Sequence, residues 1–315
     1  MAMNLPSPTS PLRIGTRGSP LALAQTYETR ARLMKAFDLP EAAFEVVVIK
    51  TTGDVILDRP LKEIGGKGLF TREIEDDLLS GKIDIAVHSM KDMPVEQPHG
   101  LLLDTYLPRE DVRDAFVSLK AKGIADLAEG ETVGTSSLRR RAQILNRRPD
   151  LNVVEFRGNV QTRLKKLDAG VATCTFLAMA GLNRLAMDGV PATGIATEEM
   201  LPAVAQGAIG IERRGDDTRV AEMLEAIHDI PTGQRLACER AYLTQLEGSC
   251  ETPIAGLAEL EGGTVHFRAE ILRPNGSEAL SDAESSTIED AAEMGRAVAD
   301  RLTARAPKDF FDWRS

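Results

Sequence analysis

A repeated order of strands and helices constrains the fold of this chain more than any other feature. A first β-α-β-α-β order is predicted from the segments LRIGT, SPLALAQTYETRARLMKAF, FEVVVIKT, LFTREIEDDLLSG and IDIAVHS. The same order recurs from about residue 131 in TVGTS, SSLRRRAQILNRR, LNVVEF, NVQTRLKKLDAG and ATCTFLA. Strands that alternate with helices are typical of a parallel sheet. The duplication therefore predicts two similar α/β halves that face each other across a cleft.

The remaining segments predict how the halves are connected and where a further domain begins. Residues 108–114 lead into the second half and residues 200–212 lead back, and two crossings predict a hinge. From Pro231 onward, a helix, three antiparallel strands and a last helix predict a smaller C-terminal α+β domain. The predicted division is a disordered segment 1–10, domain 1 at 11–107 with 208–229, domain 2 at 108–207 and domain 3 at 230–315.

The composition argues against several classes of protein. A formal net charge of -10 and a pI near 5.1 oppose general binding to nucleic acids, which needs a dominant positive field. Residues 1–10 lack the apolar core of a secretory signal, and no apolar run reaches the length of a membrane span. Three cysteines without a CxxC pair predict neither a disulfide framework nor a metal site. A cytoplasmic protein without membrane or nucleic-acid contacts is expected.

A basic cluster stands out against this acidic background. Residues 139–166 contain nine Lys and Arg but only two acidic residues, Asp150 and Glu155. Arg139 and Arg140 fall in the first turns of a predicted helix, where a cation opposes the helix dipole. An anionic ligand therefore explains them better than a solvated helix face does.

Other residues of the two halves are expected either to bind a ligand or to lie on a solvated helix face. Arg157 and Arg163 flank a loop at the carboxyl end of a predicted strand, where α/β sheets bind ligands, and Arg17 and Ser19 take the corresponding place in the first half. This arrangement suits a ligand with several carboxylates, and phosphate stays an alternative. The group expected on a solvated helix face consists of Arg147, Arg148, Lys165 and Lys166.

Two further residues are candidates for chemistry. Asp92 directly follows a predicted strand, with Lys91 beside it, so its carboxylate is expected in the cleft, where it can stabilise a cation and exchange protons. The alternative is that Asp92 only forms a turn. Cys250 lies in a loop just past a helix, where its sulfur can be exposed, although a lone loop cysteine is usually inert. Cys174 and Cys238 are expected as small packing residues.

Six motifs mark the chain from its N-terminus into the predicted third domain. They are RGSPLALAQ (17–25), GDVILD with GGKGLF (53–70), DIAVHSMKDMP (84–94), VGTSSLRR (133–140), RGNVQTRL (157–164) and EGSCETPI (247–254). In this order, and over nearly the whole chain from Leu12, they resemble the hydroxymethylbilane synthase (porphobilinogen deaminase) family. The resemblance implies a transferase whose first two domains are similar to the lobes of type II periplasmic binding proteins. A monomer is expected.

The resemblance also implies a reaction, a cofactor and a set of site residues. Four porphobilinogen molecules would be joined head to tail with loss of ammonia, and hydrolysis would release hydroxymethylbilane for tetrapyrrole biosynthesis. A dipyrromethane cofactor would be held by a thioether to Cys250, and Asp92 would contact its pyrrole nitrogens and stabilise the developing cation. The positions that match carboxylate-binding residues are Lys91, Ser136, Arg139 and Arg140 for the cofactor, and Arg17, Ser19, Arg157, Arg163 and the flap residue Lys67 for the substrate.

Some positions depart from the family pattern, and two other functions remain open. Ala205 stands where glycine is common, Thr173 where aspartate is common, and Glu63 in a flap position that is basic in some members. The segment GGKG (65–68) lacks the ending of a phosphate-binding P-loop, so a flap is predicted there.

The alternatives to an enzyme are a non-catalytic two-lobed protein that binds small anions and, more distantly, a nucleic-acid-binding module.

Overall fold

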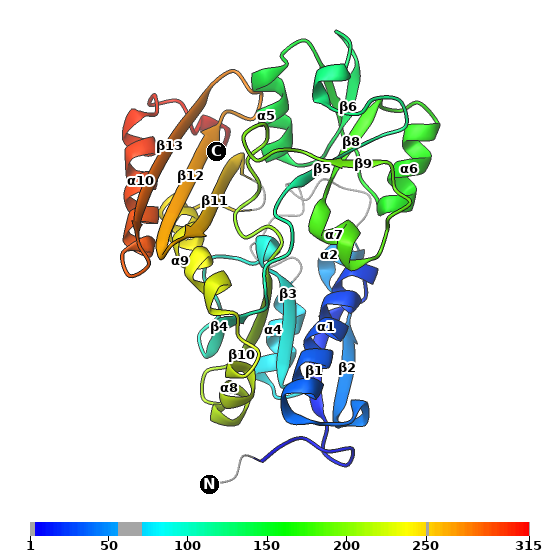
Figure 1. Cartoon of the computed structure of the whole chain (residues 1–315), viewed down its shortest axis with the longest axis vertical. Helices are drawn as coiled ribbons and strands as arrows, with labels where there is room; N and C mark the ends of the chain where they lie inside the picture. The colour runs from blue at the N-terminus through cyan, green and yellow to red at the C-terminus, as the bar shows by residue number, and fades with distance from the viewer. Residues whose placement is uncertain (1–3, 56–70, 250–251, 315) are drawn as a thin grey trace. The chain divides into compact units, whose positions relative to one another are not determined.

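The computed structural model describes residues 4–55, 71–249 and 252–314, and it contains two compact units (Figure 1). Unit 1 comprises Met1–Glu110 and Gly207–Gly233, and unit 2 comprises Asp111–Gln206 and Gln234–Ser315. Unit 2 thus includes both the second α/β lobe and the C-terminal α+β part, and the division into three domains stays a prediction. Within the segment predicted to be disordered, an isolated bridge joins Ser7 to Ser10.

Unit 1 is built on a mixed sheet. Its strands are ordered β2 (Phe44–Ile49), β1 (Leu12–Arg17), β3 (Ile85–Ser89), β10 (Ile209–Arg214) and β4 (Leu101–Tyr106). As predicted, β1 is parallel to β2 and β3, whereas β10 is antiparallel to both β3 and β4. The expectation of a purely parallel sheet is wrong at β10. This strand comes from the segment that returns from the second lobe, and it enters the sheet in the opposite direction.

The helices of unit 1 begin and end at signals visible in the sequence. Helix α1 (Pro20–Phe37) starts at Pro20, and Ser19 Oγ accepts a hydrogen bond from the Ala22 N–H at 3.3 Å, as the predicted cap. Helix α4 (Arg72–Leu79) is followed by Gly81 with φ of 71°, a conformation that favours glycine. The other helical segments are η1 (Glu41–Ala43), α2 (Thr52–Val55), η2 (Met90–Asp92) and α8 (Thr218–Glu225).

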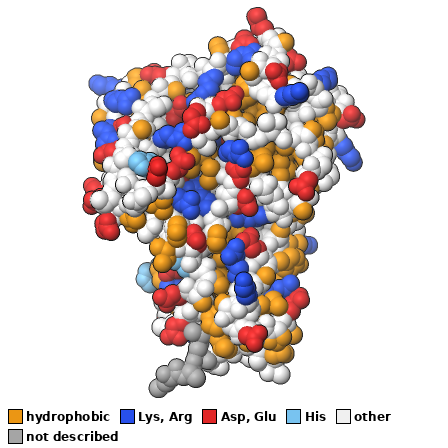
Figure 2. Space-filling model, in the orientation of Figure 1, with side chains coloured by type: hydrophobic (Ala, Val, Ile, Leu, Met, Phe, Trp, Pro, Cys, Tyr) orange, Lys and Arg blue, Asp and Glu red, His pale blue; other side chains and the backbone are white. Residues whose placement is uncertain are grey.

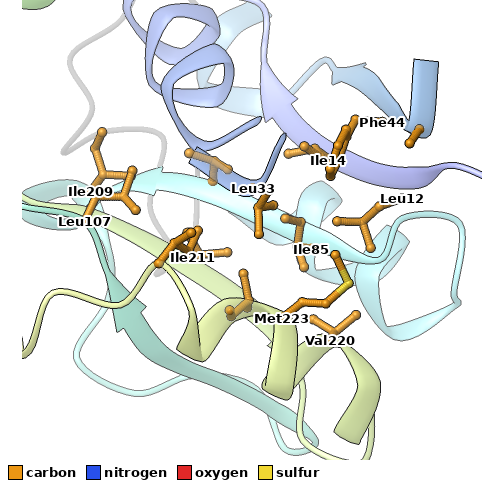
Figure 3. Packing of buried hydrophobic residues seen from close by; sticks show 14 residues of the cluster. Leu12, Ile14, Leu33, Phe44, Ile85, Leu107, Ile209, Ile211, Val220 and Met223 are labelled. Atoms are coloured by element: carbon orange, nitrogen blue, oxygen red, sulfur yellow. The ribbon is translucent and has the colours of Figure 1, made fainter. Parts of the chain in front are cut away.

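Helices cover both faces of this sheet with apolar side chains. On one face Ile14, Ile85 and Ile211 pack with Leu33 of α1 and Met223 of α8 (Figure 3). On the other face the sheet packs against α4 through a second buried cluster. Burial of each such side chain contributes about 1.5–3 kcal/mol. The packing therefore fixes the strands firmly, and with them the residues that follow the carboxyl ends of β1 and β3.

The lobe in unit 2 repeats the strand order of unit 1. Its strands are ordered β7 (Asn152–Val154), β6 (Thr132–Gly134), β8 (Cys174–Ala178), β5 (Asp114–Ser118) and β9 (Ala192–Gly194). β6 is parallel to β7 and β8, and β5 is antiparallel to β8 and β9. β5 thus takes the place that β10 has in unit 1. The predicted duplication is confirmed, and each copy contains one antiparallel strand that the sequence pattern did not predict.

The helices of unit 2 are also capped locally. Ser137 Oγ accepts from the Arg140 N–H at the start of α5 (Leu138–Arg147), and Asn159 Oδ1 accepts from the Thr162 N–H at the start of α6 (Val160–Asp168). The lobe also contains η3 (Ile124–Asp126) and α7 (Met179–Arg184). The C-terminal part has the predicted antiparallel sheet and helices, with α9 (Ile230–Gln245), β11 (Ile254–Glu261), β12 (Thr264–Leu272), β13 (Ala279–Thr287), α10 (Ala291–Arg305) and η4 (Asp312–Arg314).

Hydrogen bonds hold the C-terminal part to the lobe within unit 2. Asn146 Nδ2 of α5 donates to the Gly276 carbonyl at 2.9 Å, and a Cβ at Gly276 would collide with the α5 backbone. The buried Glu239 carboxylate of α9 accepts from the N–H groups of Ala205 and Ala258 at 2.6 and 2.8 Å.

Among the described residues, no helix combines the length and the apolar character that crossing a membrane requires.

The backbone at Ala205 has a left-handed conformation, which favours glycine. The effect of this conformation on stability can be tested. The φ of Ala205 is 61° and the residue is 1% exposed. A left-handed non-glycine residue costs about 1–2 kcal/mol. Ala205→Gly removes this strain but loses a buried methyl group, about 0.8 kcal/mol, and adds about 0.5–1 kcal/mol of entropic cost. We therefore expect the free energy of unfolding to change by less than about 1 kcal/mol in urea denaturation.

Ala208→Gly is the matched control. Ala208 is 2% exposed and does not have a positive φ. The substitution loses the same methyl group with no strain to release, so we expect a loss of about 1–2 kcal/mol. Equal losses for the two variants would show that the left-handed backbone of Ala205 carries no strain.

Candidate active site

A pocket in unit 1 lies where β1 and β3 end, beside the first turns of α1. Its polar lining consists of Arg17, Ser19, Gln25, Thr71, His88, Ser89 and Asp92. Arg17 is the last residue of β1, and Ser19 caps α1. The fold thus brings the predicted site residues Arg17, Ser19 and Asp92 into one pocket, as expected at the carboxyl ends of strands in an α/β sheet.

Backbone contacts hold Asp92 in this pocket. The 3-10 helix η2 places Met90 inward and Asp92 outward, and Asp92 is exposed. The Met90 N–H donates to the Ala208 carbonyl at 3.0 Å, and the Met93 N–H donates to the Met90 carbonyl at 3.2 Å. A Cβ at Gly210 would overlap the Met90 side chain, so glycine is needed on the neighbouring strand. The half-buried Lys91 precedes Asp92 in the same turn.

Gln25 is a pocket residue that the sequence interpretation missed. It lies on α1, is 3% exposed, and its Nε2 donates to Ser89 Oγ at 2.8 Å. This bond ties the first helix to the end of β3 across the pocket. The sequence offers little signal for Gln25, because α1 contains many polar residues and its buried face also includes Thr26 and Thr29.

The predicted arginines of unit 2 surround a buried carboxylate. Arg139 Nη2 and Arg140 Nη2 each lie 2.7 Å from an oxygen of Asp114, at the first position of β5. Gln206 Nε2 donates to the same carboxylate at 3.0 Å. Asp114 is fully buried. The expectation that Arg139 and Arg140 need an external anion is therefore corrected in part, because Asp114 already supplies one negative charge.

The electrostatics of this cluster still favour an anionic ligand. Burial alone would raise the pKa of Asp114, but Arg139 and Arg140, with hydrogen bonds from Arg140 and Gln206, hold that pKa well below its usual range. Burial lowers the pKa of Arg139 despite the attraction of Asp114. Two guanidinium groups share one carboxylate, so the group keeps a net positive charge.

Arg163 adds a third cation to this cluster. Its Nε donates to the Gly158 carbonyl at 2.9 Å, and its Nη1 lies 3.4 Å from the Phe176 carbonyl, which Arg140 Nη1 also contacts. Burial and the neighbouring Arg140 lower the pKa of Arg163 to about 10. Within the described part of the chain, no carboxylate pairs with Arg163. An anion placed there would relieve the cost of burying this cation.

Ser136 and Arg157 lie on loops beside the same cluster. Ser136 Oγ accepts from the Phe156 N–H at 3.0 Å and so joins the loops that follow β6 and β7. Arg157 is half-buried, and its carbonyl accepts from Lys166 Nζ at 2.9 Å. The structure thus brings Ser136, Arg139, Arg140 and Arg163 to one end of the second sheet, with Arg157 on the adjoining loop.

The expected solvated helix face is only partly confirmed. Lys165 and Arg147 are exposed, although Arg147 lies 3.5 Å from the buried Glu270. Arg148 instead donates to the Ile124 and Leu127 carbonyls, and Lys166 lies over the Phe156 ring. Both have structural contacts because their long side chains reach neighbouring loops.

The cysteines differ in environment. Cys174 and Cys238 are fully buried, as predicted for packing residues. Burial raises the pKa of Cys174 to about 12 and that of Cys238 well above the usual range. Cys250, Lys67 and Glu63 lie outside the described residues. In the ranges that the structure describes, no group of three or more His, Cys, Asp or Glu side chains is arranged to hold a metal ion.

The residues present fit a cofactor or substrate with several carboxylates. Among the described residues, Arg163 contacts only neutral acceptors, and Arg139 and Arg140 carry more positive charge than Asp114 neutralises. Guanidinium groups bind carboxylates in pairs of parallel hydrogen bonds. In unit 1 the pocket combines Arg17, which can bind an anion, with Asp92, which can stabilise a cation.

Comparison with known proteins gives matches over nearly the whole chain. Residues 12–222 match the family model "Porphobilinogen deaminase, dipyromethane cofactor binding domain", and residues 234–304 match "Porphobilinogen deaminase, C-terminal domain". The chain is 63% identical to the porphobilinogen deaminase of Paracoccus denitrificans, over 98% of this chain and 99% of that protein. It is 51% identical to the chloroplastic porphobilinogen deaminase of Pisum sativum, over 96% of this chain and 84% of that protein.

Among solved structures, the chain has a low similarity to periplasmic binding proteins. The aliphatic sulphonate binding protein of Escherichia coli is 14% identical, with a TM-score of 0.40, over 75% of this chain and 70% of that chain. An arginine-specific periplasmic binding protein of Salmonella typhimurium is 13% identical, with a TM-score of 0.38, over 69% of this chain and 90% of that chain.

Proposed function

Because the chain belongs to the porphobilinogen deaminase family, we propose that it is a transferase that condenses four porphobilinogen molecules head to tail and releases hydroxymethylbilane. The observation that carries this proposal is the family match over nearly the whole chain. The alternative of a non-catalytic anion-binding protein is not supported, because the matching family consists of enzymes. On the face that Figure 2 shows, basic and acidic side chains are interspersed, unlike the continuous basic stripe of nucleic-acid-binding proteins.

We propose that unit 1 carries the groups that act on the reacting pyrrole. Arg17, Ser19 and Lys91 bind carboxylates of the substrate and cofactor, because each offers donors to an anion. As ammonia leaves porphobilinogen, positive charge forms on the pyrrole, and the Asp92 carboxylate stabilises this charge. Asp92 is held in place by the backbone of η2, so it needs little reorganisation during the reaction.

We propose that unit 2 binds carboxylates through its arginines. Arg139 and Arg140, oriented by Asp114, hold the dipyrromethane cofactor together with Ser136, and Cys250 bonds to it covalently. Arg157, Arg163 and Lys67 bind the added substrate units. When bound, the cofactor supplies the free pyrrole carbon to which the first substrate unit is joined. Each added unit brings two more carboxylates, and these arginines balance that charge.

Two measurements test this proposal directly. The purified protein incubated with porphobilinogen should form hydroxymethylbilane and release ammonia. The intact mass of the purified protein should exceed the mass of the polypeptide by one dipyrromethane unit. Bare polypeptide mass, together with no product, would contradict the proposed function.

Substitutions of the arginines should separate cofactor binding from substrate binding. We expect each of the variants Arg139→Leu and Arg140→Leu to be mostly apoprotein. In each variant the cofactor carboxylates lose an arginine partner, and Asp114 keeps only one arginine. Arg157→Leu and Arg163→Leu should still permit cofactor attachment but should stall elongation, so that partly extended complexes accumulate. Intact-mass analysis measures both outcomes.

Lys165→Leu is the matched control for the arginine series. Lys165 lies on α6, two positions from Arg163, and is exposed. We expect normal cofactor content and turnover, since a surface charge contributes little.

Arg139→Lys separates charge from geometry, because lysine cannot form the paired hydrogen bonds of a guanidinium. If all of these variants behaved alike, the cluster would act as a diffuse positive field and the individual assignments would be wrong.

The location and oligomeric state belong to the same proposal. We propose a monomer that acts in the cytoplasm. Light scattering of the purified protein measures its mass in solution, and fractionation of cells measures its location. A stable dimer, or recovery outside the cytoplasm, would contradict these two points.

A further inference from the structure

Three buried titratable side chains meet next to the pocket of unit 1. They come from three elements: His88 from β3, Glu212 from β10 and Glu75 from α4. They are 6%, 0% and 8% exposed, respectively. His88 Nε2 lies 3.1 Å from Glu212 Oε2. The antiparallel pairing of β3 with β10 fixes this contact, because it sets Gly210 opposite His88 and Glu212 opposite Ala86.

The cluster buries two carboxyl groups but only one basic group. Glu212 Oε1 is buried and has no hydrogen-bond partner among the described residues. Burial and the neighbouring Glu212 raise the pKa of Glu75, although Thr71 and His88 act in the opposite direction. Two buried carboxylates and one imidazole are costly unless protons are bound among them. The cluster is therefore suited to hold protons.

His88 connects this cluster to the pocket. It is one of the residues that line the pocket, together with Arg17 from β1 and Asp92 from η2. On its other side it meets Glu212, and Glu75 lies near. Among the residues described here, His88 is thus placed to pass a proton between a buried carboxylate and a bound molecule. The mechanism proposed above assigns no role to this histidine.

The proposed reaction needs such an exchange at every addition. When the C–N bond of porphobilinogen breaks, the electron pair leaves with nitrogen, and the amine must gain one proton to depart as ammonia. When the new C–C bond has formed, the attacking pyrrole carbon loses one proton and the ring regains its aromatic electrons. One proton is given and one is recovered, so a single group can serve the whole cycle without another reactant.

We propose that His88, supported by Glu212, is a further catalytic residue that gives a proton to the leaving amine and recovers one from the pyrrole carbon. This inference rests on the proposed function. It differs from the role of Asp92, whose carboxylate stabilises the charge on the ring. Glu75 contributes by keeping a proton within the cluster.

The pH dependence of turnover tests the role of His88. His88→Gln keeps a nitrogen donor toward Glu212 but cannot titrate. We expect a loss of about 10²-fold or more in kcat, as for a missing general acid or base. The alkaline fall in kcat, where the wild type loses the donated proton, should also disappear. Glu212→Gln should keep this fall but move its midpoint to lower pH, because a nearby carboxylate favours a protonated imidazole.

Controls separate catalysis from structure. His99 is exposed, so His99→Gln should leave both kcat and its pH dependence unchanged. If His88→Gln does not fold, NMR titration of His88 in the wild type and in Glu212→Gln replaces it, and the wild-type midpoint should coincide with that of kcat. A His88→Gln protein with an unchanged pH profile, or a His88 signal that does not titrate with kcat, would overturn this inference alone. A wild type that forms no product from porphobilinogen would overturn the proposed function as well.

Discussion

Cys250→Ser should yield a folded protein that carries no pyrrole cofactor and has no measurable activity. A thioether requires a sulfur nucleophile, and the serine hydroxyl is far less reactive at neutral pH. The substitution changes one atom in a predicted loop, so the fold should persist. Intact mass should show bare polypeptide, and the assay with porphobilinogen should show no product.

Cys174→Ala and Cys238→Ala are the controls for this result. Both thiols are fully buried, and burial keeps them protonated by raising their pKa values. A buried, protonated thiol is a poor nucleophile. Both variants should therefore keep the adduct, with some loss of stability from the smaller side chain. Peptide mapping that located the adduct on Cys174 or Cys238 would refute the assignment of Cys250.

Asp92→Asn should keep the fold and the cofactor but lower turnover by about 10²–10³-fold, the usual cost of removing a group that stabilises developing charge. The amide has the size of the carboxylate but not its charge. Since backbone hydrogen bonds of η2 place this residue, the substitution should not move the turn. Single-turnover kinetics with porphobilinogen measures the effect on the chemical step.

Glu96→Gln is the matched control for Asp92→Asn. Glu96 is an exposed carboxylate only four positions further along the chain, outside the pocket lining. It should lose little activity, because an exposed charge is screened by solvent. Near-normal turnover of Asp92→Asn would remove Asp92 from the centre of the mechanism. Equal losses in both variants would point to a general effect of negative charge in this region.

Local signals in the sequence determined much of the fold. Ser19 and Pro20 predict the start of α1, and alternating apolar residues predict β3 and the turn with Asp92 that follows it. The repeated order of elements predicts two similar lobes, and the motifs predict the family. These signals act over one helical turn or a few strand residues, so the sequence carries them directly.

The tertiary structure alone decided which distant polar residues pair with one another. Asp114 pairs with Arg140 across 26 positions, Gln25 with Ser89 across 64, and His88 with Glu212 across 124. The two antiparallel strands β5 and β10 place Asp114 and Glu212 inside the sheets. A buried charge is stable only beside a partner. That partner is set by strand order and packing, which the local pattern of a sequence does not contain.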